Sequence, residues 1–153
     1  MAAGDIVFFD QYTVDVQEGV HNQETDTFKV GLITAVSPQP AATTADPRWG
    51  AGGTTNYSSS EVTPGGNYSS GGPSAANPAV TLSGGAGVFD ADDISVTQHA
   101  SNPTNARWGI LYNDTAAGKN ALGYVDLGAA VDLSAGDFSI AWNASGISSI
   151  DQA

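Results

Sequence analysis

The chain contains no cysteine, so neither disulfide bonds nor thiolate metal sites contribute to its fold. Basic residues are also scarce: four lysines and arginines stand against sixteen aspartates and glutamates, and the formal net charge is −12. A field of this sign repels the phosphates of nucleic acids and of anionic membranes. Nucleic acid and membrane surfaces are therefore excluded as expected partners.

Long apolar runs are missing as well. No stretch approaches the roughly 20 apolar residues of a membrane-spanning helix. The N-terminus lacks a basic segment followed by an apolar run, which a secretory signal would need. We therefore expect a protein that is made and kept without secretion.

Turn-forming residues, in contrast, are abundant. The chain has 19 glycines and seven prolines, and only 13% of its residues are charged. This composition favours an all-β chain with many turns over a helical protein. A length of 153 residues suits a single β-rich domain that spans residues 1–153. We expect about nine short strands, arranged as an antiparallel β-sandwich or jelly roll, with a short helix near the N-terminus.

Residues 106–143 form the stretch around which the chain is organised. Trp108, Ile110 and Tyr112 alternate with their neighbours, as expected for a β-strand. A polar turn follows, then a returning strand near residues 122–127 and a third strand at residues 138–142. Three strands joined by short polar loops predict an antiparallel meander whose apolar face packs against another layer.

The N-terminal part predicts a helix and then a central strand. Phe8, Tyr12 and Val16 recur every four residues, which indicates a short amphipathic helix ending near Gly19. Residues 27–36 follow as a strand with three apolar side chains on one face. The predicted inward-facing core set is Phe28, Val30, Leu32, Trp108, Ile110, Tyr112 and Phe138.

The composition changes between residues 37 and 76, where Pro, Gly, Ser, Thr and Asn dominate. We expect an extended arm here, with short strands near residues 60–62 and 67–69. Tyrosine and tryptophan offer large contact areas at low entropy cost, so Trp49, Tyr57 and Tyr68 are the predicted partner-binding anchors. The alternative is a mobile loop that touches nothing.

Few residues suggest chemistry. Asp90, Asp92 and Asp93 lack the glycine and the bidentate glutamate of a helix-loop-helix calcium loop, so solvated carboxylates are the better interpretation. His21 and His99 are the two histidines, and their spacing does not place them together. No nucleophile elbow or phosphate-binding loop occurs. We therefore expect no metal, no cofactor and no enzymatic activity.

Several segments resemble a family of small structural proteins of tailed phages, encoded near the head genes. The resemblance covers most of the chain outside the segment after residue 37. It is carried by residues 18–22, 25–32, 89–94, 106–119, 123–128 and 136–142.

This resemblance implies a virion component that is made in the host cytoplasm, namely a capsid decoration or cement protein on the exterior of the capsid. The implied partner is the major capsid protein, whose lattice such a protein binds and stabilises. A homo-oligomer at a symmetry axis of the shell would multiply weak contacts, and we expect a trimer rather than a dimer.

Two other functions stay open. A tail or collar component is the first, because such proteins also use small β-sandwich domains. A carbohydrate-binding module is the second, with Trp49, Trp108 or Trp142 as a stacking platform for a sugar ring.

Overall fold

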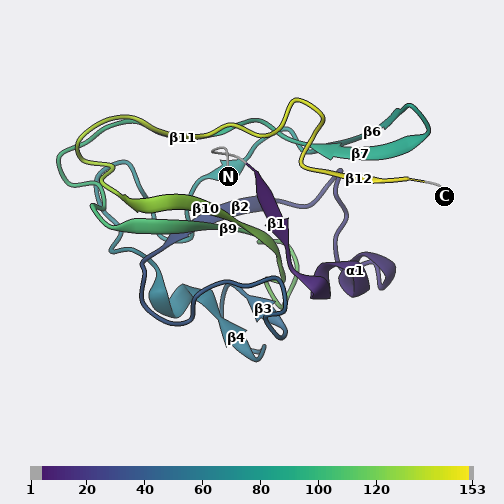
Figure 1. The fold of residues 1–153 in the computed structure, drawn as a ribbon, viewed down its shortest axis with the longest axis horizontal. Helices are drawn as coiled ribbons and strands as arrows, with labels where there is room; N and C mark the ends of the chain where they lie inside the picture. The colour runs from purple at the N-terminus through teal and green to yellow at the C-terminus, as the bar shows by residue number, and fades with distance from the viewer. Residues whose placement is uncertain (1–4, 152–153) are drawn as a thin grey trace.

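A computed structural model describes residues 5–151 and shows a chain built mostly of antiparallel β-strands with one short helix near the N-terminus, as predicted (Figure 1). The elements are β1 (Ile6–Phe8), α1 (Asp10–Gln17), β2 (Phe28–Ile33), β3 (Pro47–Arg48), β4 (Thr55–Asn56), the 3-10 helix η1 (Tyr57–Ser60), β5 (Ser74–Ala75), β6 (Ala79–Ser83), β7 (Ala86–Asp90), β8 (Ile94–Val96), β9 (Ala106–Asn113), β10 (Ala121–Val131), β11 (Phe138–Ile140) and β12 (Ser148–Ile150).

A five-stranded antiparallel sheet lies at the centre, in the order β1-β10-β9-β2-β5. Its middle strand, β9, is buried along almost its whole length, and only Arg107 is partly exposed. A strand covered on both faces needs apolar side chains at consecutive positions, which the run from Trp108 to Tyr112 supplies. The central sheet is therefore the middle of three layers.

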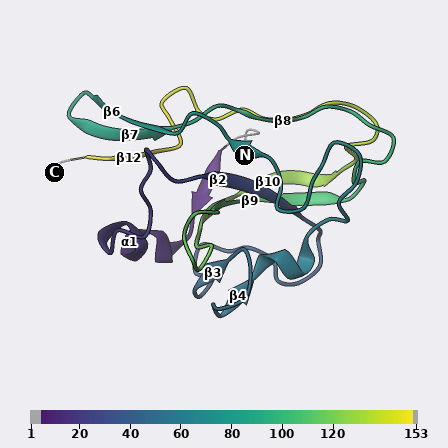
Figure 2. The same ribbon diagram turned by 180° about the vertical axis from the view of Figure 1, so that it is seen from behind.

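One face of the central sheet is covered by β8 and β11 together with the three-stranded sheet β12-β7-β6 (Figures 1 and 2). The core between these layers includes the ring pair Phe28 and Phe89, whose centroids are 5.2 Å apart. Val30 and Leu32 point to the same side as Phe28, because alternate residues of β2 share a face. This packing holds the layer of β8, β11 and the sheet β12-β7-β6 against the central sheet.

The opposite face is covered by the segment that leads through β3, β4 and η1 (Figure 1). Trp49 stacks on Tyr112 with ring centroids 5.1 Å apart and planes 10° apart. The indole lies directly over Gly31, where a Cβ would come within 2.2 Å of it, so only glycine permits this approach. Phe9 and Tyr57 complete this second core, with ring centroids 5.7 Å apart.

All seven residues of the predicted core are buried, so that prediction is confirmed. The predicted meander is only partly correct. β9 and β10 pair antiparallel as expected, but β11 pairs with β8 in the other layer and not with β10. The chain leaves the central sheet after an irregular register between Asp126 and Val131, where Gly128 takes a φ of 79°. The chain then passes to the other layer through the buried residue Leu133, whose backbone N–H donates to the carbonyl of Pro103.

The predicted helix over residues 6–19 is shorter than expected. Ile6–Phe8 instead forms β1, which adds an edge to the central sheet by pairing with β10. A run of β-branched and aromatic residues fits a pleated surface better than a helix, which explains the difference. The helix begins only at Asp10, and Gly19, with a φ of 71°, follows its end as predicted.

The prediction of an extended arm with exposed anchors is wrong. Trp49, Tyr57 and Tyr68 are buried, with exposed fractions of 5%, 0% and 1%. Glycine and proline in residues 37–76 do not make the backbone an arm; they let irregular backbone pack closely on the sheet. In place of the two predicted strands the chain forms η1 and single bridges, from Glu61 to Ile33 and from Gly65 to Tyr68.

Replacing Phe138 with alanine tests the two-layer core. The side chain is 7% exposed and packs between β8 and the central sheet, so we expect a loss of about 3–5 kcal/mol in the free energy of unfolding. Chemical denaturation measures it. Ser139→Ala, on the exposed face of the same strand, is the control and should change stability by less than about 0.5 kcal/mol. Equal midpoints for the two variants would contradict the assignment.

Tyr68→Phe tests whether the segment after residue 37 is part of the folded core. The Tyr68 hydroxyl accepts a hydrogen bond from the Leu32 N–H at 2.8 Å and donates one to Glu61 at 3.1 Å. Its removal leaves a buried N–H unpaired, and the free energy of unfolding should fall by about 1–3 kcal/mol. Tyr124→Phe is the matched control, since its hydroxyl has no hydrogen bond within the described residues. Identical melting curves for both variants would refute a structural role for Tyr68.

Candidate association surface

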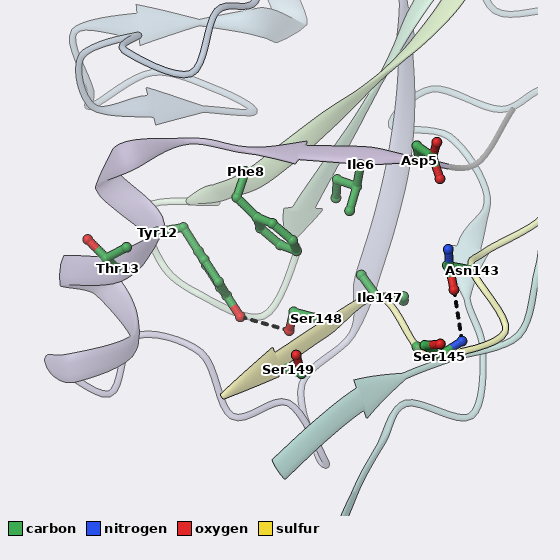
Figure 3. Close-up of a pocket in the computed structure, with 11 residues that line it drawn as sticks. Asp5, Ile6, Phe8, Tyr12, Thr13, Asn143, Ser145, Ile147, Ser148 and Ser149 are labelled. Carbon is green, nitrogen blue, oxygen red and sulfur yellow. Dashed lines mark hydrogen bonds between the residues drawn. The ribbon is translucent and has the colours of Figure 1, made fainter. Parts of the chain in front are cut away.

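A groove of about 720 Å³ lies between β1, α1 and β12 (Figure 3). Its apolar floor is formed by Ile6 and Phe8 from β1, by Tyr12 from α1, and by Ile147 just before β12. Polar side chains form the rim: Asp5, Thr13, Asn143, Ser145, Ser148 and Ser149. An apolar floor with a polar rim is the usual composition of a binding groove.

The local sequence explains why these side chains meet. Ile6 and Phe8 point to the same side of β1 because one residue separates them, and Phe8 stacks on Tyr12 with centroids 4.7 Å apart. The Tyr12 hydroxyl lies 3.2 Å from the Ser148 hydroxyl, so the helix and β12 are joined across the groove (Figure 3). Gly146, with a φ of 94°, turns the chain so that Ile147 points inward.

Beside the groove, the sheet β12-β7-β6 overhangs the body (Figures 1 and 2). The pairing register places Val80, Leu82 and Ile150 on the same face as Phe89, because residues directly opposite in an antiparallel pair share a face. Phe89 is buried in the core, but Val80 is 37% exposed, Ile150 57% and Leu82 83%. The apolar face therefore continues past the body into solvent. We call the groove and this overhang together the association surface.

The loop after α1 lies beneath the overhang, and the buried side chain of His21 anchors it. His21 Nδ1 lies 3.2 Å from Nδ2 of Asn113, and Nε2 lies 3.7 Å from Oδ2 of Asp15. Burial lowers the pKa of His21 from its ordinary value of 6.5, although the charges of Asp15 and Asp26 act in the opposite direction. The ring is therefore neutral in the folded protein at neutral pH.

Asparagine side chains complete this buried network. Asn113 donates from Nδ2 to the Asp26 carboxylate at 2.7 Å, and its Oδ1 accepts from the backbone N–H groups of Thr115 and Ala116. Asn120 donates to Asp15 at 2.9 Å. The buried carboxylate of Asp15 is thus held by amide donors rather than by a cation. From the sequence, Asn113 was expected only to begin a polar turn.

The predicted anchors lie away from the association surface. Trp49 lines a second, polar pocket of about 480 Å³ that also contains Lys29, Asp114 and Lys119. Lys29 lies 3.1 Å from Asp114, and Lys119 bonds the other oxygen of the same carboxylate. Partial burial acts to raise the pKa of Asp114, but the hydrogen bonds and charges of Lys119 and Lys29 outweigh it, so this pKa lies below its ordinary value. Tyr57 and Tyr68 line neither cavity.

None of the three tryptophans presents a ring to solvent. Trp49, Trp108 and Trp142 are 5%, 8% and 8% exposed. The Arg107 guanidinium lies 4.5 Å from the centroid of Trp108, and the Trp142 indole donates to the carbonyl of Asp92 at 3.0 Å. The three tryptophans that the sequence suggested as stacking platforms for a sugar ring are therefore buried.

The carboxylates of Asp92 and Asp93, just after β7, hydrogen-bond to other parts of the chain. Asp93 accepts from the backbone N–H of Trp142 at 2.9 Å, and Asp92 accepts from the Asn77 amide at 2.6 Å. Between residues 5 and 151, no three His, Asp or Glu side chains are grouped so that they could hold a metal ion. His21 is buried beside Asn113, whereas His99 is exposed and accepts from the Ser101 N–H.

Sequence reasoning missed the residues of the association surface. Ile6 and Ile147 lie far apart in the chain, and β1 and β12 do not pair with each other. The signal for this surface in the sequence was the set of apolar residues near the two ends of the chain, outside the central strands.

In the part of the chain that the structure describes, no helix is long and apolar enough to cross a membrane. Comparison with family models, curated proteins and solved structures found no match to this chain.

The neutral, buried His21 predicts acid sensitivity near neutral pH. The unfolded chain binds a proton at a higher pH than the folded chain does, so the free energy of unfolding should fall as the pH drops below about 6.5. Asp114 and Asp126 have lowered pKa values and contribute only in more acidic solution, below about 3.8. Denaturant unfolding between about pH 5 and pH 8 isolates the histidine.

His21→Gln should flatten this pH dependence, whereas His99→Gln should leave it as in the unmodified protein, because His99 is exposed. An unchanged slope in the His21 variant would show that another group controls it.

Proposed function

We propose that this chain is a structural protein of a phage virion that decorates the exterior of the capsid, where its association surface binds the major capsid protein lattice. The observation that carries the proposal is the apolar surface itself. The groove and the overhang leave apolar side chains uncovered, although the central sheet is closed by packed layers on both faces. The resemblance of residues 106–119 and 136–142 to small phage head proteins points the same way.

The distribution of apolar groups supports a binding role for this side. Among residues 5–151, Leu82, Ile150 and Val80 are three of the five exposed large apolar side chains, and all three lie on one face of the overhanging sheet. Contiguous apolar surface on a soluble body marks a place of contact with another molecule. The groove adds a concave apolar floor next to this face, so a partner can bury both at once.

The rigidity of the body supports decoration of a shell. The groove is formed in the free chain by the Tyr12–Ser148 contact and by the ring stack of Phe8 on Tyr12, so little order has to be imposed on binding. The segment after residue 37 does not supply the partner contacts that the sequence suggested, because its aromatic side chains are buried. We therefore assign binding to the preformed groove and overhang instead.

Charge supports a position outside the capsid. A net charge of −12 repels packaged DNA, and high net charge keeps a protein soluble when many copies accumulate. A tail or collar component has the same requirements of solubility and rigid contact, and it stays the second candidate. The number of copies in each particle distinguishes the two, because a shell holds many more equivalent sites than a tail.

Rebinding to bare capsids tests the proposal. Capsids from a phage whose gene for this chain is deleted are incubated with purified protein and sedimented. The unmodified protein should sediment with the shells in many copies. Thr13→Lys/Ser149→Lys places two ammonium groups on the groove rim, and it should weaken binding by about tenfold or more because one or both charges must be desolvated.

Thr63→Lys/Ser69→Lys is the matched control. It makes the same substitutions at exposed positions outside the groove and changes the net charge equally. Its binding should equal that of the unmodified protein, and both double variants should keep the original melting temperature. Binding only to purified tails, or equal loss of binding in both variants, would overturn the proposal.

A further inference from the structure

The outer edge of the overhanging sheet is an unprotected strand. β6 (Ala79–Ser83) pairs with β7 on one side only, and all five of its residues are exposed. Soluble proteins usually block such an edge with lysine, proline or a bulge. β6 contains none of these, and none of its residues is charged, although the chain carries a net charge of −12.

The turn of the β6–β7 hairpin determines which backbone groups are free. Gly84 and Gly85 both have positive φ, 58° and 94°, and they connect the pair Ser83 and Ala86 as a two-residue hairpin turn. In such a hairpin the pair next to the turn is hydrogen-bonded, and bonding then alternates along the strand. The N–H and C=O groups of the two residues at the alternate positions therefore point away from β7.

Those residues are Val80 and Leu82. The register on the other side of β7 agrees with this alternation. Phe89 lies opposite Val80, and its carbonyl accepts from the Ile147 N–H at 2.8 Å, on the side away from β6. Two donors and two acceptors thus face solvent along the edge of β6.

We propose that a second copy of this chain pairs antiparallel with β6 about a two-fold axis through Thr81. Val80 of each copy then lies opposite Leu82 of the other, and the four free backbone groups of each copy form four hydrogen bonds with those of its partner. The same register places the apolar side chains of Val80 and Leu82 side by side on one face. The two three-stranded sheets become one sheet of six strands.

A second copy fits this edge better than an unrelated strand does. β6 has an apolar residue on each side of Thr81, so in the paired copies an apolar residue meets an apolar residue on both sides of the axis. β6 itself carries no charge, so no like-charged side chains of this strand meet across the two-fold axis. A two-fold contact makes a dimer, whereas a trimer was expected from the sequence.

The contact is smaller than a standard protein interface, so it is weak in solution and becomes effective where many copies are held close together. The inference does not depend on the proposed function, because it rests on the geometry of β6 alone.

A charge exchange at residue 81 tests the register. The two Thr81 side chains face each other across the axis, so Thr81→Lys and Thr81→Glu each place like charges opposite one another. Sedimentation velocity over a concentration series should show a dissociation constant raised by about tenfold or more for either variant alone. An equal mixture of the two should dimerise at least as well as the unmodified protein, because opposite charges then meet.

Ser149→Lys and Ser149→Glu are the controls, since Ser149 lies in the same row of the sheet as Thr81 but on the opposite edge. Neither should change dimerisation, and mixing them should have no effect. In this cysteine-free chain, Thr81→Cys with an added oxidant should form a disulfide-linked dimer, whereas Ser149→Cys should not.

An unmodified protein that stays monomeric up to millimolar concentration would overturn the proposal. Equal behaviour of the mixed and the single Thr81 variants would overturn it too, since this register requires their difference. Protection of the β6 amides from hydrogen exchange only when capsid protein is added would assign the edge to a strand of that protein instead.

Discussion

Burial of β9 on both faces is the constraint on which the rest of the structure depends. A strand flanked by β2 and β10 and covered above and below needs apolar side chains from Trp108 to Tyr112, and its polar residues Arg107 and Asn113 stand near its two ends. The layer of β8 and β11 covers one face, and Trp49 with its neighbours covers the other. The chain therefore uses its irregular middle part as packing, and the uncovered apolar surface lies at β1, β6 and β12, away from β9.

This arrangement explains which parts of the fold the sequence could predict. Alternating apolar residues identified β2 and β9 as core strands. Both strands are covered on both faces, however, so Ile33 and Leu111 in the alternate rows are buried as well, which alternation alone does not predict. The partner of β11 was mispredicted, because neighbours in sequence were assumed to pair, and the irregularity near Gly128 moves the chain to the other layer. Residues 37–76 look like an arm by composition, but Gly31 leaves room for Trp49 on the sheet, which composition does not reveal.

The association surface could not be predicted for a related reason. Its floor joins Ile6 to Ile147, and its exposed face depends on the register that places Gly87 of β7 between Leu82 of β6 and Ile150 of β12. Neither fact follows from local pattern. The same holds for His21, whose burial beside Asn113 depends on a contact between residues 92 positions apart in the sequence. Aromatic residues in a polar segment suggested surface anchors, whereas the exposed apolar groups of this surface are the aliphatic side chains Val80, Leu82 and Ile150 on an overhanging sheet.

The central claim is that the protein binds the shell of a virion through the groove and the overhang. An electron-microscopy map of virions that carry the unmodified protein tests it most directly. The account predicts density for the protein on the outer surface of the capsid, with the groove between β1 and β12 and the exposed face of β6 turned toward the capsid lattice or toward a neighbouring copy. A map that shows the protein only on the tail, or on the shell with this surface open to solvent, would contradict it.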